Sequence, residues 1–143
     1  MATTTNLLTW KEFEQLPDEH PLWGMKFLEE GGWPDEVIQA IAAHYSQKPG
    51  VKPETPLQRH LFACDELSGL ITAVTYVRPS RSIREVEVKS VMKKFRTPAF
   101  AAGVNRDDVT HGAELIGLPL DQHVENCIKA MQERAEELGL AGA

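Results

Sequence analysis

The stretch from Thr55 to Val77 constrains the fold more than any other part of the sequence. It opens with Thr55-Pro56-Leu57-Gln58, a capping-box pattern with a hydroxyl cap, Pro at the first helical position and Gln three residues after the cap. Its apolar residues then fall on more than one face of a helix, namely Leu57, Leu61, Phe62, Cys64, Leu67, Leu70, Ile71 and Val74. Such a helix must be surrounded by others. The pattern therefore predicts a central helix that Pro79 ends.

Helical segments punctuated by Pro and Gly flank this central helix on both sides. Residues 83–88 contain β-branched side chains, but a single strand has no partner run elsewhere, so we expect an irregular segment or a short helix there. The fold class predicted is all-α, in one domain over residues 1–143 with a flexible tail over 1–6. The other helices are expected at 7–15, 21–31, 34–45, 89–95, 98–103, 105–115 and 119–138.

The composition narrows the class of partner and the compartment. A net charge of −6 argues against nucleic acid as the main partner. No apolar stretch approaches the ~20 residues of a membrane helix, and the first residues do not resemble a secretory signal. We therefore expect a cytoplasmic protein with no membrane span. The charge is uneven, because seven cations and two carboxylates between Arg78 and Arg96 give a local balance of +5.

Three residues of metal-binding type, His20, His44 and Asp65, lie on three successive predicted helices. Imidazole and carboxylate suit Fe, Mn or Zn, and helical bundles build such sites from facing helices. These residues are 24 and 21 positions apart, so their convergence depends on the tertiary fold. The alternative is structural, with His20 as a helix cap, His44 as a partner of a helix dipole and Asp65 as a locally bonded residue.

The remaining cysteines and histidines are interpreted as structural. Cys64 and Cys127 lie within apolar helical patterns and are expected to be buried core thiols. The other imidazoles sit beside polar positions and are expected to be structural or surface residues, namely His60, His111 and His123.

Several separate strings give the chain a family resemblance. They are 17–24 (Pro-Asp-Glu-His-Pro-Leu-Trp-Gly), 36–44 (Glu-Val-Ile-Gln-Ala-Ile-Ala-Ala-His), 63–71 (Ala-Cys-Asp-Glu-Leu-Ser-Gly-Leu-Ile), 77–80 (Val-Arg-Pro-Ser) and 100–106 (Phe-Ala-Ala-Gly-Val-Asn-Arg). In sequence and in order they resemble HD-domain metal-dependent phosphohydrolases, over about 7–140. The resemblance implies an HD-like helical bundle that lacks the first helices of the family. It also implies that His20, His44 and Asp65 match three of the family's metal ligands.

The family's His-Asp doublet is missing from this sequence. Aligned backwards from His20, Thr9-Trp10 stand where the doublet belongs. Two imidazoles and one carboxylate can hold one metal with open positions, whereas hydrolysis by two metals is not expected from them. Trp10 at this position suggests an apolar or altered pocket. No catalytic residue is assigned.

The resemblance also places the basic segment near the family's active site. Arg78, Arg81 and Lys89 could there hold a phosphate or carboxylate, and Trp10 and Glu66 complete the predicted ligand-binding set. The alternative is a solvated basic face that neutralises acidic neighbours.

Three functions remain open. The first is a degenerate HD-like pseudoenzyme that binds a small ligand, anionic or partly apolar, without hydrolysing it. The second is a hydrolase or other enzyme with one divalent metal, Fe, Mn or Zn, at His20, His44 and Asp65; the cofactor could also be absent. The third is a helical interaction module. Because the family's first helices are missing, exposed apolar surface is expected, and with it a homodimer unless the segment around Trp10 and Phe13 covers that surface.

Overall fold

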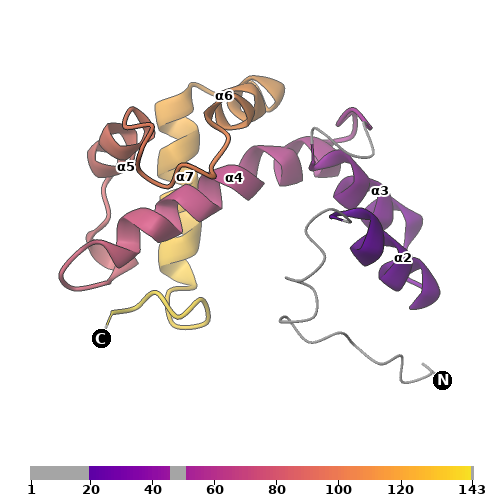
Figure 1. Ribbon diagram of the computed structural model, residues 1–143, viewed down its shortest axis with the longest axis horizontal. Coiled ribbons are helices and arrows are strands. Elements are labelled where there is room, and N and C mark those ends of the chain that lie inside the picture. The colour runs from indigo at the N-terminus through magenta and orange to yellow at the C-terminus, as the bar shows by residue number, and fades with distance from the viewer. Residues whose placement is uncertain (1–19, 46–50, 143) are drawn as a thin grey trace. The chain divides into compact units, whose positions relative to one another are not determined.

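The computed structural model describes residues 20–45 and 51–142 of the chain (Figure 1). Within these ranges the chain is helical, and the prediction of an all-α fold is confirmed. The elements are α2 (Leu22–Glu30), α3 (Asp35–Ala43), α4 (Pro56–Tyr76), the 3-10 helix η2 (Ile83–Glu85), α5 (Val88–Phe95), α6 (Arg106–Leu115) and α7 (Leu120–Glu133). The HD-like arrangement of these helices stays a prediction. The helix expected at 7–15 and the tail at 1–6 lie outside the described residues.

The chain divides into two compact units, Met1–Leu61 and Phe62–Ala143, and the boundary falls within α4. Each unit is described by itself below. The prediction of one continuous domain stays a prediction.

In the first unit, α2 and α3 pack against each other. Gly31 and Gly32 make the turn between them, and Gly32 has a φ of 72°, which glycine adopts without steric cost. Asp35 and Glu36 lie in the first turn of α3, where negative charge suits the helix dipole. The buried residues of α3 are Ile38 and three alanines, Ala40, Ala42 and Ala43.

The beginning of α4 has the capping box that the sequence predicts. The Gln58 N–H donates to Thr55 Oγ1 at 3.3 Å, and the Thr55 N–H donates to Gln58 Oε1 at 3.2 Å. Two of the backbone donors that a helix start leaves unpaired are thereby satisfied.

The second unit has its own apolar core. The carboxyl-terminal part of α4 supplies Leu67, Leu70, Ile71 and Val74, and α7 supplies Val124 and Ile128. Helix α7 also contacts α5, α6 and η2. The backbone of α6 approaches that of α4 closely, because a Cβ added at Gly112 would lie only 2.6 Å from the Ala63 Cα.

The segment between α5 and α6 is not the short helix that we expected over 98–103. Turns occupy it instead, and Ala101 has a φ of 45°. The Arg106 guanidinium donates to five carbonyl oxygens that a helix would need for its own bonds, those of Phe95, Thr97, Phe100, Ala101 and Val104. Side-chain bonds from Arg106 therefore take the place of the helical backbone pattern in this segment.

The end of α7 also differs from the prediction. The apolar periodicity continues to Leu138, but the helix ends at Glu133 and turns follow. The chain then meets η2, where the Ile83 N–H donates to the Leu140 carbonyl at 2.8 Å. The expectation of a short helix or irregular segment at 83–88 is confirmed by η2.

In the part of the chain that the structure describes, no helix is both long enough and apolar enough to cross a membrane.

Candidate functional site

The structure brings together two of the three predicted metal ligands. His20 immediately precedes Pro21 at the start of α2, and His44 is the C-cap residue of α3. Their Nε2 atoms lie 3.0 Å apart, and their rings are nearly perpendicular, at 84°. Both side chains are half-buried. Residues 24 positions apart thus meet within the first unit.

The hydrogen bonds of this pair determine where its protons lie in the neutral state. His44 Nδ1 contacts the Ile41 carbonyl, which can only accept, so Nδ1 carries the proton. In a neutral imidazole, His44 Nε2 is then the acceptor, and His20 Nε2–H donates to it. A carbonyl partner on the remote ring nitrogen is also the usual arrangement of a metal-bound histidine.

Two imidazole nitrogens bound to one tetrahedral ion lie about 3.3 Å apart, as follows from metal–nitrogen bonds of about 2.0–2.1 Å. The observed separation of 3.0 Å is therefore compatible with a cation in place of the shared proton. The bond from His44 to Ile41 also satisfies a carbonyl at the end of α3, as the structural alternative requires.

Asp65 and Glu66 lie on α4, in the second unit. Asp65 is exposed, and its role as a metal ligand stays a prediction. Glu66 is half-buried, and its Oε2 accepts from the Asn105 N–H at 2.9 Å. Burial raises the pKa of Glu66 above its ordinary value, although the bond from Asn105 opposes this shift. Glu66 thus joins α4 to the start of α6, and its ligand-binding role also stays a prediction.

The three basic residues predicted to hold an anion lie in the second unit, after α4. Arg78 is half-buried, and its Nη2 lies 3.9 Å from Glu85 Oε2, which also accepts from Ser80 Oγ at 2.7 Å. Arg81 and Lys89 are exposed. Glu85 therefore already offers Arg78 a negative partner, and anion binding by this segment stays a prediction. Trp10, the fifth predicted ligand-binding residue, lies outside the described residues.

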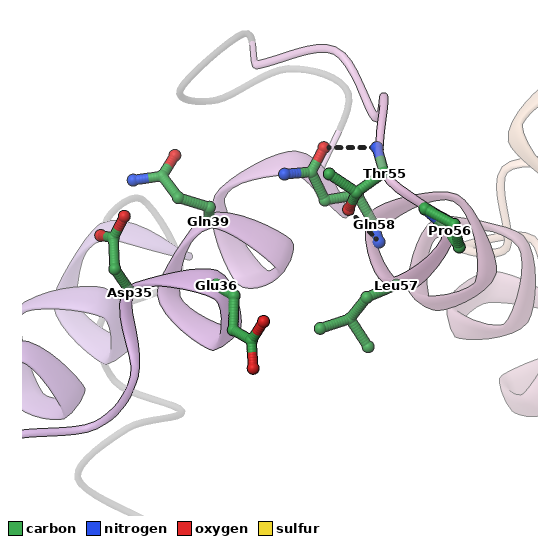
Figure 2. A pocket seen from close by; sticks show the side chains of 7 residues that line it. All are labelled: Asp35, Glu36, Gln39, Thr55, Pro56, Leu57 and Gln58. Carbon is green, nitrogen blue, oxygen red and sulfur yellow. Dashed lines mark hydrogen bonds between the residues drawn. The ribbon is translucent and has the colours of Figure 1, made fainter.

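A hollow of about 520 Å³ opens on the first unit (Figure 2). Residues of α3 line one side of it, and the first turn of α4 with its cap lines the other, in all Asp35, Glu36, Gln39, Thr55, Pro56, Leu57 and Gln58. Asp35 and Glu36 give it negative charge, and it contains none of the predicted site residues that the structure describes. Its chemistry does not suit an anionic ligand.

A second group of residues that could hold a metal ion lies in the second unit, and the sequence analysis missed it. It consists of Cys64 on α4 with His123 and Cys127 on α7. The cysteines are half-buried and His123 is buried. The contact with Cys64, together with burial, raises the pKa of the Cys127 thiol. The spacing of four between His123 and Cys127, which puts both on one helix face, was the available signal.

No protein-family model, curated protein or solved structure matches this chain. The likeness to HD-domain hydrolases therefore remains a resemblance carried by the strings quoted above.

Proposed function

We propose that this protein is an HD-like domain that holds one divalent metal ion between His20 and His44 and binds a small ligand at that ion. The observation that supports the proposal best is the 3.0 Å approach of the two Nε2 atoms. The carbonyl of Ile41 fixes the tautomer of His44 so that its Nε2 lone pair points at the partner.

The proposed ion would supply positive charge and open coordination positions for a ligand. Neutral imidazoles suit Fe, Mn or Zn, as expected from the sequence. An anionic ligand would be attracted by the ion itself.

Hydrolysis by two metals is not part of the proposal. The resemblance assigns the bridging carboxylate to the missing doublet, where this chain has Thr9-Trp10. Asp65 remains a candidate third ligand on the resemblance alone.

The proposal is tested by metal content per chain after growth with Fe, Mn and Zn. The variant His44→Ala should lose the metal bound in the first unit while its circular dichroism stays unchanged. His60→Ala is the matched control, because His60 is an exposed residue of α4 whose Nδ1 also bonds to a backbone carbonyl, that of Pro56, at 2.7 Å. The decisive comparison is made in a Cys127→Ala background. Equal metal content with and without the additional His44→Ala change would refute the proposal.

The same variants separate a binding protein from an enzyme. A chain that binds metal but hydrolyses no phosphoester supports the pseudoenzyme, whereas turnover that disappears in both His44→Ala and Asp65→Ala supports an active site with one metal. Loss of metal in Asp65→Ala would show that this carboxylate belongs to the site.

A further inference from the structure

The second unit contains a compact group of two thiols and one imidazole. Cys64 Sγ lies 4.0 Å from Cys127 Sγ, and Cys127 Sγ lies 3.8 Å from His123 Nδ1. All three ligand atoms lie within 4.8 Å of one another. They come from two different helices, α4 and α7, so the group is a product of tertiary packing.

These distances are close to those of a zinc site. Zn–S bonds of about 2.3 Å and Zn–N bonds of about 2.0–2.1 Å at tetrahedral angles place two sulfurs about 3.8 Å apart and sulfur and nitrogen about 3.6 Å apart. The observed values of 4.0 and 3.8 Å each exceed the tetrahedral ones by about 0.2 Å. Side-chain rotation alone could close such a difference.

The imidazole is oriented as a metal ligand requires. His123 Nε2 lies 2.8 Å from the Ala63 carbonyl, which only accepts, so Nε2 carries the proton. Nδ1 of the neutral ring is then unprotonated and faces Cys127 Sγ. His123 is only 2% exposed, so this tautomer is held by the protein and not by solvent.

The outer partner of His123 lies at the contact between α4 and α6. Ala63, which accepts from His123, immediately precedes Cys64 on α4 and lies against Gly112 of α6. A movement of Ala63 toward α6 is therefore blocked by backbone. Cys64 and the acceptor of His123 are thus adjacent residues of α4, and this acceptor is the kind of outer partner that orients a metal-bound histidine.

From this geometry we infer that Cys64, His123 and Cys127 bind one thiophilic divalent ion, for which Zn²⁺ is the fitting species. Two thiolates and a neutral imidazole balance the charge of a divalent ion, so the loaded group is neutral in its half-buried surroundings. Three protein ligands leave a fourth tetrahedral position for water or an external ligand. This site is separate from the His20–His44 pair and does not depend on the proposed function.

Cobalt is the probe that distinguishes the two sites. The full-length chain, reduced and stripped with a chelator, is titrated with Co²⁺ and then with Zn²⁺. We expect a thiolate-to-cobalt charge-transfer band that saturates at one equivalent and is abolished by Zn²⁺. Imidazoles alone give no such band, so the His44→Ala variant should keep the band. The Cys64→Ala and Cys127→Ala variants should lose it.

Quantitatively, Zn²⁺ affinity should fall by more than roughly 100-fold in either cysteine variant, since loss of an outer partner alone costs about 10–100-fold. His111→Ala, which removes an exposed histidine of α6, is the matched control and should bind like the wild type. Circular dichroism verifies the fold of each variant. If a cysteine variant fails to fold, the test is made on the wild type instead: bound Zn²⁺ should protect its two thiols from alkylation.

The inference is wrong if the reduced wild type shows no charge-transfer band, or if Zn²⁺ leaves both thiols equally open to alkylation. It is equally wrong if the band persists in Cys127→Ala. In each case Cys64, His123 and Cys127 would be packed together without binding a metal, or the two cysteines would be a pair that forms a disulfide when oxidised.

Discussion

Arg106 shows how much a single side chain can organise. Its half-buried guanidinium donates to five backbone carbonyls of the segment 95–104, with distances of 2.6 Å to Ala101 and 3.0 Å to Val104. The Thr97 and Ala101 carbonyls also accept turn bonds from the Phe100 and Val104 N–H groups, and Arg106 adds a side-chain donor to all five carbonyls. Arginine suits the task because its planar group has five donors in fixed directions.

The variant Arg106→Lys should therefore be less stable, by about 2–3 kcal/mol, because an ammonium cannot reach all of these carbonyls. Urea unfolding followed by circular dichroism measures the difference. Arg96→Lys is the control, since Arg96 is exposed at the end of α5, and it should change stability by less than about 0.5 kcal/mol. Equal losses in the two variants would contradict the role given to Arg106.

Glu66 leads to a prediction on pH. Burial raises the pKa of Glu66 in the folded state, so its protonated form favours folding. That contribution is fully present below the ordinary pKa of the carboxyl and is lost as pH rises through the raised pKa. Glu66→Gln keeps an acceptor for the Asn105 N–H but cannot ionise.

The ordinary pKa of a glutamate carboxyl is about 4.3. The stability of Glu66→Gln relative to the wild type should consequently increase as pH rises from about 4 toward neutrality. Unfolding free energies of both proteins at several pH values give this difference. A constant difference across the range would mean that Glu66 titrates alike in the folded and unfolded chains.

At the scale of elements, two glycines on helices have opposite roles. Gly112 of α6 lies where a Cβ would meet the Ala63 Cα at 2.6 Å, whereas a Cβ at Gly69 of α4 would have no atom within 4 Å. Backbone atoms cannot yield as a flexible side chain can, so the contact between α6 and α4 requires glycine.

Gly112→Ala should accordingly destabilise the protein by about 2–3 kcal/mol, because α6 must move away from α4. Gly69→Ala should stabilise it by about 0.5–1 kcal/mol through the better helix propensity of alanine. Thermal unfolding of both variants tests the pair. A Gly112→Ala protein as stable as the wild type would show that the helices are not packed as described.

On the scale of the whole molecule, the two units differ in how much apolar surface they bury. The second unit has a core of large aliphatic side chains such as Leu67, Leu70 and Ile71. In the described part of the first unit, the buried apolar residues of α3 are Ile38 and three alanines, and α2 has none. Burial of apolar area is the main source of stability, so the first unit should open more easily.

Amide hydrogen exchange should therefore be at least about tenfold faster in α2 and α3 than in α7, which corresponds to about 1.4 kcal/mol in the free energy of opening. Mass spectrometry of peptides from the two units gives both rates in one experiment. Equal protection would indicate that the two units open together.

The homodimer expected from the sequence also belongs to this scale and stays a prediction. Large apolar side chains are exposed on both units, including Trp33 at 54% and Val77 at 59%. Sedimentation analysis at micromolar concentration tests it, and a monomer there would remove the idea.

Local chemistry was enough to predict most helices of this protein. The capping box at Thr55 and Gln58, the Asn105 cap of α6 and the prolines before α2, α3 and α7 act within a few residues of themselves, so the sequence shows them directly. The structure contradicts two predictions, a helix at 98–103 and a last helix reaching Leu138. In each place a group outside the predicted helix competes with it: Arg106 bonds to carbonyls that the first helix would use, and the Ile83 N–H of η2 bonds to the Leu140 carbonyl beyond the last helix.

The candidate sites divide in the same way. The residue types of the His20–His44 pair were visible in the sequence, but only the packing of α2 on α3 placed their nitrogens 3.0 Å apart. The group of Cys64, His123 and Cys127 was missed because its members are separated by as many as 63 positions and join only where α4 meets α7. Spacing along the chain therefore determined most of the helices that the structure describes, whereas contacts between helices decided which side chains can act together.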